Sequence, residues 1–210
     1  MATLKLGILV SGSGTNLQAI LDAVANRTLD AEIRLVVSNV PGVRALERAR
    51  DAGVPHLVLP HREYPNREAF DQVLVDTLRG AGVEWVALAG FMRVLTAKFL
   101  CAFERHVVNI HPALLPAFPG THAQKQAVDY GVKVAGCTVH FVDEGVDTGP
   151  IIAQRTVPVL DDDDEPRLGA RLLEQEHAIY VEVLRWIAAD RVRVVPGEAG
   201  ARAHVVVSPP

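Results

Sequence analysis

The sequence has few of the features that would point to a secreted, membrane-spanning or disulfide-stabilised protein. Only two of its 210 residues are cysteine, a number typical of a reducing compartment. No run approaches the roughly 18 consecutive apolar residues that suggest a membrane span. The amino-terminal segment carries a single lysine and leads directly into a glycine-rich turn, unlike a signal peptide. These absences predict a cytoplasmic protein without a membrane partner.

The chain also lacks a surplus of basic residues and any recognisable metal-binding motif. Its formal net charge is −4, which offers no electrostatic attraction for nucleic acid or an anionic membrane. Its eight histidines include no His-Glu-x-x-His motif, and the cysteines do not lie at metal-binding spacing. We therefore expect no metal and no nucleic-acid partner. The sequence is compatible with a monomer or a homodimer.

What the sequence does contain is an alternation of short apolar runs with segments of helical periodicity. The run Leu6–Val10 ends at a glycine-rich turn, as a buried parallel strand does. Further strands are expected at residues 33–37, 55–59, 85–89, 107–110, 134–142 and 151–159. Helices are expected around residues 17–24 and at 43–52, 67–82 and 167–189. This order predicts an α/β fold: an open, mostly parallel twisted sheet with helices on both faces.

The same pattern suggests how the chain is divided. Residues 1–190 are expected to form a single domain, whose first part, about 1–100, binds phosphate and whose second part, about 101–190, is catalytic. Residues 191–210 are expected to form a carboxy-terminal hairpin and tail. The acidic run Asp161–Glu165 precedes the last helix, where we expect a solvated loop whose charge favours the helix start.

Two motifs near the middle of the chain carry the clearest catalytic pattern. Asn109 and His111 are two residues apart on an expected strand, so both side chains point to the same side. An amide N–H and a charged imidazole aimed at one carbonyl oxygen stabilise developing negative charge, and Asp147 can orient the imidazole and accept a proton. The trio predicts acyl transfer at a carbonyl and contains no evident covalent nucleophile. Cys137 fits a buried strand better than a nucleophilic site. Turn formation and a buried core histidine explain the same residues.

The turn Ser11–Asn16 joins the first strand to the first helix, where backbone N–H groups and the helix dipole favour an anion. It lacks the third glycine of the dinucleotide fingerprint, and the second strand ends in Ser38 and Asn39 rather than in an acidic residue. It also lacks the lysine of a P-loop. A phosphate site and an ordinary turn capped by Thr15 or Asn16 both remain open.

Several motifs occur together in a specific order and spacing: Ser11–Asn16, Ala89–Arg93, Asn109–Pro116, Phe118–His122, Val139–Val142, Asp147–Ile152 and Gln175–Tyr180. In this combination the chain, roughly from Leu4 to Arg193, resembles the glycinamide ribonucleotide (phosphoribosylglycinamide) formyltransferases. These are folate-dependent enzymes of purine biosynthesis. The resemblance implies a Rossmann-like formyltransferase fold. It also implies transfer of a formyl group from the cosubstrate 10-formyltetrahydrofolate to the primary amine of glycinamide ribonucleotide.

The resemblance assigns roles to matching positions. The catalytic residues would be Asn109, His111 and Asp147. The ribonucleotide would be bound by Gly14, Thr15, Asn16 and Glu176. The folate would be bound by Arg67, Met92, Arg93, Val94, Leu95, Asn109, Asp143, Glu144, Gly145, Val146 and Asp147. Supporting roles would fall to His122 and His140.

Three other functions fit part of the pattern. Formyltetrahydrofolate deformylases share the Asn-x-His and Asp motifs but deliver water to the formyl group, and they usually carry an additional amino-terminal domain. Methionyl-tRNA formyltransferases add a carboxy-terminal nucleic-acid-binding domain. A folate- or nucleotide-binding module without catalytic activity would not need all three catalytic groups. Because the chain starts at its first strand and has no basic surplus, we expect the ribonucleotide transferase.

Overall fold

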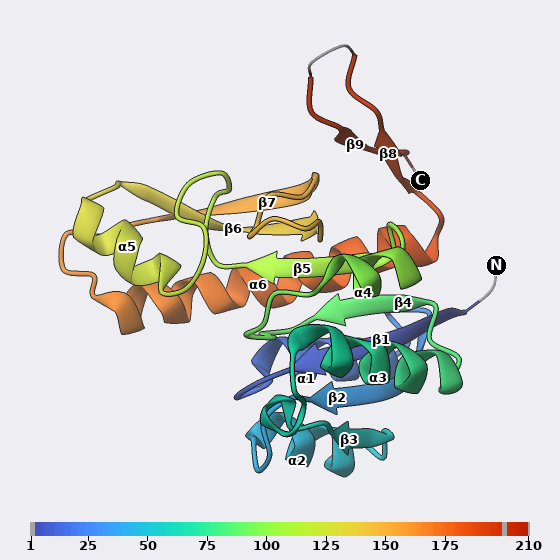
Figure 1. The fold of residues 1–210 in the computed structure, drawn as a ribbon. Helices are drawn as coiled ribbons and strands as arrows, with labels where there is room; N and C mark the ends of the chain where they lie inside the picture. Colours follow the sequence, from blue (N-terminus) through green and yellow to red (C-terminus); the bar gives the residue numbers. More distant parts are fainter. Residues whose placement is uncertain (1–2, 199–200, 210) are drawn as a thin grey trace. The chain divides into compact units, whose positions relative to one another are not determined.

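The computed structural model describes residues 3–198 and 201–209 and divides the chain into two compact units, residues 1–109 and 110–210. The first unit alternates strands and helices (Figure 1). Its elements are β1 (Leu4–Val10), α1 (Thr15–Ala25), β2 (Ala31–Ser38), α2 (Arg44–Asp51), β3 (His56–Val58), the 3₁₀ helix η1 (His61–Glu63), α3 (Arg67–Gly80), β4 (Trp85–Leu88), α4 (Ala97–Ala102) and β5 (Val107–His111), whose last residues enter the second unit.

The second unit contains one long helix, a hairpin of long strands and a short terminal hairpin. Its elements are α5 (Ala123–Tyr130), β6 (Val134–Phe141), β7 (Ile151–Pro158), α6 (Glu165–Ala188), β8 (Val192–Val195) and β9 (His204–Val207). Strands β8 and β9 pair antiparallel, as predicted for the carboxy-terminal hairpin.

Strands β1 to β7 belong to one sheet in the order β3-β2-β1-β4-β5-β6-β7. The pairs β1–β2, β1–β4, β2–β3 and β4–β5 are parallel, whereas β6–β7 is antiparallel. The predicted α/β fold with an open, mostly parallel sheet is therefore confirmed. Because parallel strands end at the same edge of a sheet, the turns that follow β1, β2 and β4 gather there.

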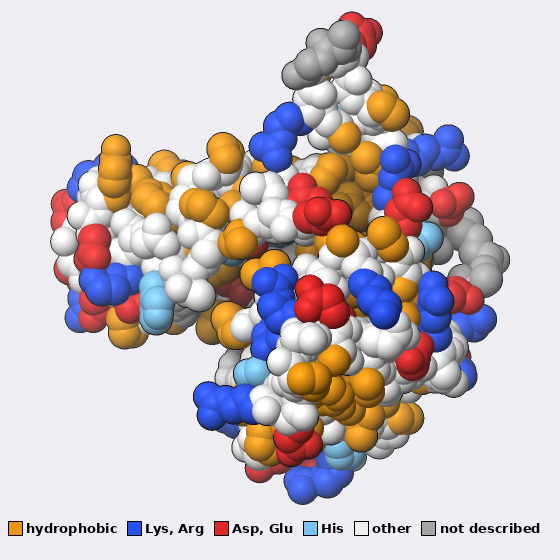
Figure 2. All heavy atoms as spheres, viewed as in Figure 1, with side chains coloured by type: hydrophobic (Ala, Val, Ile, Leu, Met, Phe, Trp, Pro, Cys, Tyr) orange, Lys and Arg blue, Asp and Glu red, His pale blue; other side chains and the backbone are white. Residues whose placement is uncertain are grey.

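Burial of apolar side chains explains the strand and helix positions. In the first unit, Leu6 and Ile8 of β1 and Leu17 of α1 are completely buried, as is Phe70 of α3. Helix α1 packs beside α2, and α3 packs beside α4. Acidic and basic side chains are interspersed over the molecular face in Figure 2. Within the described residues, no helix is both long enough and apolar enough to span a bilayer.

The sequence did not predict the three short helices η1, α4 and α5. None of them exceeds eight residues. The acidic run before α6 does favour the helix start, because Asp164 accepts a hydrogen bond from the Arg167 backbone N–H at 2.9 Å. The expectation of a solvated loop is wrong for Asp163, whose side chain is 1% exposed and is paired with Arg171 at 2.7 Å.

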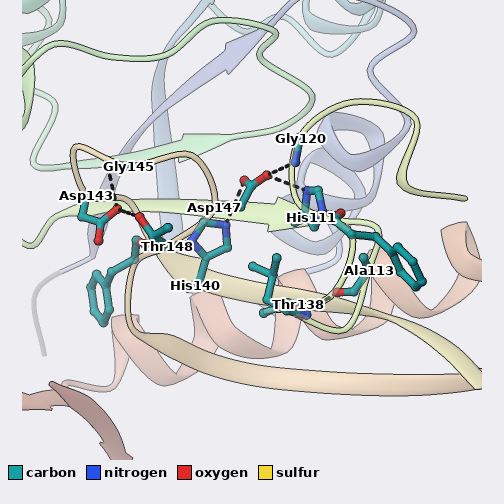
Figure 3. Close-up of polar contacts among 12 residues, drawn as sticks. His111, Ala113, Gly120, Thr138, His140, Asp143, Gly145, Asp147 and Thr148 are labelled. Carbon is teal, nitrogen blue, oxygen red and sulfur yellow. Dashed lines mark hydrogen bonds and ion pairs between the residues drawn. The ribbon is translucent and has the colours of Figure 1, made fainter. Parts of the chain in front are cut away.

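The segment that follows His111 is held to strand β6 by Thr138, which is completely buried. Its hydroxyl donates to the Ala113 carbonyl at 2.6 Å and accepts from the Leu115 N–H at 3.1 Å (Figure 3). The same oxygen accepts from the Gln154 amide at 3.0 Å. This one hydroxyl therefore fixes the backbone directly after the predicted catalytic histidine.

We expect Thr138→Val to lower the free energy of unfolding by about 1–3 kcal/mol, because it leaves buried backbone groups without partners. Thr138→Ser keeps the hydroxyl and serves as the matched control. Denaturant unfolding of both variants measures the effect. Equal stability of the valine and serine variants would show that these hydrogen bonds do not hold the segment.

Candidate active site

Two predicted histidine side chains of the second unit meet at the Asp147 carboxylate (Figure 3). His111, at the end of β5, places its Nδ1 atom 3.3 Å from Asp147 Oδ2. His140, in β6, places its Nε2 atom 3.6 Å from Asp147 Oδ1. The backbone N–H of Gly120 donates to Asp147 Oδ2 at 2.8 Å. The carboxylate thus has partners on both oxygens. Both histidines are buried, His111 with 4% and His140 with 2% of its surface exposed.

These partners determine the charge of Asp147. Burial by itself would raise the pKa of this carboxyl group. The hydrogen bond from His140, the Gly120 N–H and the charges of the two histidines outweigh that effect and lower the pKa below its ordinary value. Asp147 is therefore ionised at neutral pH and can orient an imidazole or accept a proton.

The second ring nitrogen of His111 also faces an acceptor. Nε2 lies 2.9 Å from the carbonyl oxygen of Phe118, and a carbonyl oxygen can only accept. Because the partner of Nδ1 is an ionised carboxylate, an imidazole that carries a proton on each nitrogen satisfies both neighbours. The hydrogen-bond pattern thus agrees with the charged imidazole expected from the sequence.

The backbone that supplies these partners adopts uncommon conformations. Asp147 and Phe118 have positive φ angles of 54° and 53°. Asp tolerates the left-handed region better than most residues, whereas a bulky residue such as Phe rarely occurs there. Such conformations persist only where the surroundings stabilise them, and they cluster at functional sites. Here they present the carboxylate and a carbonyl oxygen to His111.

Asn109 precedes His111 by two residues on β5, so the two side chains leave the strand on the same side. Asn109 is half-buried, and its register partner in the neighbouring strand β4 is Leu88. The predicted catalytic trio therefore consists of two residues near the carboxyl end of β5 and one residue in the β6–β7 connection.

The β6–β7 connection contains the predicted folate-binding residues Asp143–Asp147. Asp143 Oδ1 accepts hydrogen bonds from the Gly145 N–H at 3.2 Å and from the Thr148 hydroxyl at 2.6 Å. Arg202, in the carboxy-terminal hairpin, donates to the Thr148 carbonyl. Glu144, Gly145 and Val146 are exposed. The connection is thus internally hydrogen-bonded while its tip is open to solvent.

The predicted phosphate turn lies at the start of α1 in the first unit. Gly14 is the N-cap and has a positive φ of 70°, and no side chain caps the helix. The expected cap by Thr15 or Asn16 is therefore wrong, and the phosphate site stays a prediction. A Cβ atom on Gly14 would lie 2.6 Å from the Cβ of Ala45 in α2. The positive φ and this close approach both require a glycine at position 14.

The remaining first-unit folate candidates surround Arg93. Its guanidinium lies 4.9 Å from the centre of the Phe70 ring. Burial lowers the pKa of Arg93, the Asp71 carboxylate opposes this change, and the like charge of Arg67 adds to it. Arg67 is exposed at the first turn of α3. Of the neighbouring candidates, Leu95 is buried, whereas Met92 and Val94 are 70% and 41% exposed.

Two further candidates lie on the second unit's α6 and at the start of α5. Glu176 is 5% exposed, and its charge acts on Cys137 of β6. Burial, aided by Glu176, raises the pKa of the Cys137 thiol to about 12, so this thiol is not a nucleophile at neutral pH. His122, in contrast, is exposed and lies 3.5 Å from Glu165. The structure gives His140, but not His122, a contact with Asp147 among the described interactions.

Sequence reasoning missed the groups that complete the site. The Gly120 N–H and the Phe118 carbonyl belong to the backbone, and the only signal for them was the motif Phe118–His122. Asn39 was considered only because it is not acidic, yet its amide contacts Ser11. Among residues 3–198 and 201–209, no group of three His, Cys, Asp or Glu side chains is arranged to hold a metal.

The lowered pKa of Asp147 predicts a pH-dependent contribution to stability. A carboxylate whose folded pKa lies below its ordinary value of 3.8 stabilises the fold fully at pH values well above 3.8. That contribution is lost as the pH falls through the folded pKa. We expect the difference in unfolding free energy between the wild type and Asp147→Asn to shrink between about pH 5 and pH 2.

Denaturant unfolding across this pH range measures the difference. Asp30→Asn, which changes an exposed carboxylate outside the site, serves as the control variant. A constant difference for Asp147→Asn over the same range would contradict the assigned partners.

Comparison with known proteins identifies the family of this chain. The family model described as formyl transferase matches residues 4–184. Phosphoribosylglycinamide formyltransferase of Escherichia coli (strain K12) is 40% identical over 191 residues, which cover 91% of this chain and 90% of that protein. The trifunctional purine biosynthetic protein adenosine-3 of Drosophila melanogaster is 47% identical over 194 residues, and the chain spans only 14% of its length.

Solved structures give the same result. Glycinamide ribonucleotide transformylase 1 from Symbiobacterium toebii superposes with a TM-score of 0.92 at 47% identity, covering 98% of this chain and 94% of that one. A formyltetrahydrofolate deformylase from Pseudomonas syringae pv. tomato reaches a TM-score of 0.88 at 26% identity, but this chain covers only 66% of it. The chain therefore belongs to the formyl transferase family and, within it, to the phosphoribosylglycinamide formyltransferases.

Proposed function

We propose that this protein transfers the formyl group of 10-formyltetrahydrofolate to the primary amine of glycinamide ribonucleotide, a step of de novo purine biosynthesis. The observation that carries the proposal is the buried His111 imidazole, 3.3 Å from the Asp147 carboxylate and two residues after Asn109 on the same strand. The phosphoribosylglycinamide formyltransferases of Escherichia coli and Bacillus subtilis, which are 40% and 41% identical to this chain, support the proposal.

The proposed reaction needs no covalent enzyme intermediate. The amine of the ribonucleotide attacks the formyl carbon, and the formyl oxygen becomes an oxyanion held by the Asn109 amide and the His111 imidazolium. The bond from carbon to the folate nitrogen then breaks as the oxyanion collapses. Asp147 assists movement of the amine proton, through water, to the departing folate nitrogen. The products are the formylated ribonucleotide and tetrahydrofolate.

His111 must change partners for this step. In the present structure its Nε2 atom faces the Phe118 carbonyl at 2.9 Å. We propose that the formyl oxygen replaces this carbonyl, while Nδ1 keeps its contact with Asp147. Catalytic hydrogen bonds commonly form only in the substrate complex, so the free-state partner does not argue against the role. His140 would support the site by holding the other Asp147 oxygen, and His122 remains a weaker supporting candidate.

The substrate sites are proposed on the residues that the sequence indicated. Gly14, Thr15 and Asn16 would bind the phosphate, because α1 begins without a side-chain cap and its N–H groups attract an anion. Glu176 would hold the ribose or the glycinamide end. For the folate, we propose Arg67, Met92–Leu95, Asn109 and Asp143–Asp147. The close like charges of Arg67 and Arg93 suit an anionic part of that ligand.

The remaining expectations complete the proposal. The partners would be the two small-molecule substrates, without nucleic acid, membrane or metal. The protein would act in the cytoplasm as a monomer or a homodimer.

The test of the proposal is release of tetrahydrofolate from 10-formyltetrahydrofolate by the purified protein, with and without glycinamide ribonucleotide. Release that requires the ribonucleotide is the expected result. Equal release without the ribonucleotide would establish a deformylase instead, and no release in either case would favour a binding module. Each of these last two results rejects the transferase.

We expect Asn109→Ala and His111→Ala each to lower kcat by at least ~10²-fold, the scale for loss of an oxyanion donor. Steady-state kinetics measure the effect, with Asn26→Ala and His204→Ala as matched controls. Both control residues lie outside the proposed sites, so their variants should retain wild-type kcat. Near-wild-type turnover of either catalytic variant would remove that residue from the mechanism.

We expect Gly14→Ala to raise KM for the ribonucleotide by roughly tenfold, because a left-handed alanine costs about 1–2 kcal/mol and its methyl group would contact Ala45. Gly53→Ala is the matched control: Gly53 also has a positive φ, of 69°, but no atom lies within 4 Å of the added Cβ. An unchanged KM in a folded Gly14→Ala protein would argue against the phosphate site.

A further inference from the structure

Ser11 contacts two segments that the proposed function assigns to different substrates. It is the first residue of the turn Ser11–Asn16, which would bind the ribonucleotide phosphate. Its hydroxyl accepts a hydrogen bond from the Met92 N–H at 2.8 Å, and its own N–H donates to the Gly90 carbonyl at 3.0 Å. Met92 is the first residue of the segment 92–95, which would line the folate pocket. The side chain of Ser11 therefore joins the two segments, and its backbone contacts Gly90, just before the second segment.

The Ser11 hydroxyl is itself held in one orientation. It donates to Asn39 Oδ1 at 2.6 Å, so it acts as donor and acceptor at once. Asn39 is 3% exposed, and its amide nitrogen lies 3.1 Å from His61 Nδ1. A hydroxyl with a single proton and a buried, fixed acceptor has little freedom to rotate. Its lone pair therefore points at the Met92 N–H only while the turn keeps its position.

The other end of the segment 92–95 is anchored independently of the turn. The Thr96 N–H donates to Asp71 Oδ2 at 2.7 Å, and Asp71 is 1% exposed. With one end anchored on α3, the position of the other end depends on Ser11. Because Met92 and Val94 are exposed between these anchors, a ligand can reach this stretch of backbone.

We propose that Ser11 is a positioning residue that couples the two substrate sites, so that each substrate raises the affinity for the other. The coupling rests on the proposed function. An anion bound at the start of α1 orders the turn, the ordered turn directs the Ser11 hydroxyl, and the hydroxyl fixes Met92. By thermodynamic linkage, the folate must then strengthen ribonucleotide binding by the same factor.

Calorimetric titration tests the coupling without requiring turnover. Tetrahydrofolate is titrated into the protein with and without saturating glycinamide ribonucleotide, and the ribonucleotide is titrated with and without tetrahydrofolate. We define the coupling factor as the ratio of the dissociation constants of one substrate without and with the other. For the wild type we expect a factor of about fivefold or more, equal for both substrates. Ser11→Ala should reduce this factor to nearly one, whereas Ser11→Thr, which keeps a hydroxyl, should retain most of it.

Two further variants separate coupling from general stability. Thr28→Ala removes a hydroxyl of the same unit that donates to the Ala23 carbonyl at 3.3 Å, outside both segments, and should keep the wild-type factor. Ser11→Cys replaces the hydroxyl by a weaker donor and acceptor of similar shape. If Ser11→Ala does not fold, Ser11→Cys should still lower the factor.

Retention of the wild-type factor in a folded Ser11→Ala or Ser11→Cys protein would overturn the inference, as would a wild-type factor of one. These failures are distinct from failure of the proposed function. Ribonucleotide-dependent formyl transfer without coupling leaves the function standing and removes the role of Ser11. Coupled binding without formyl transfer would support the role of Ser11 and reject the proposed transferase activity.

Discussion

The proposed chemistry depends on one constraint, the placement of an ionised carboxylate among hydrogen-bond donors in a largely buried environment. Asp147 would be costly to bury as an unpartnered charge, but His140, the Gly120 N–H and His111 compensate for the lost water. In return, the carboxylate orients the His111 ring. Its position depends on β6, on the β6–β7 connection and on the segment after β5, which explains why Thr138 ties that segment to β6.

In the first unit, too, polar groups at the ends of strands are held by hydrogen bonds to one another. The parallel strands β1, β2 and β4 end at one edge of the sheet, and the polar side chains that follow them satisfy one another. Ser11 and Asn39 stabilise the turn after β1, and Ser11 also contacts the backbone after β4. Turns that would otherwise be independent loops are therefore linked. Because these contacts link the two turns, a ligand that fixes one turn also restricts the other.

Sequence patterns predicted the long elements and indicated the proposed catalytic trio, but they did not predict the connections between the elements. The strands carry continuous apolar runs, and Asn109, His111 and Asp147 are chemically distinctive residues at the ends of such runs. The partners of His111 and Asp147 could not be predicted in the same way, because the Phe118 carbonyl and the Gly120 N–H are present in almost every residue. The burial of Asp163 depends on Arg171, eight residues away.

The most direct measurement of the central claim is ¹⁵N NMR of the His111 ring at neutral pH, with Asp147→Asn as the comparison. If Asp147 and the Phe118 carbonyl both accept from the ring, both nitrogen signals of the wild type will have the chemical shifts of protonated nitrogens. The Nδ1 signal should then change in Asp147→Asn. A wild-type ring with an unprotonated Nδ1 would contradict the account, because His111 would not be donating to the carboxylate proposed to orient it.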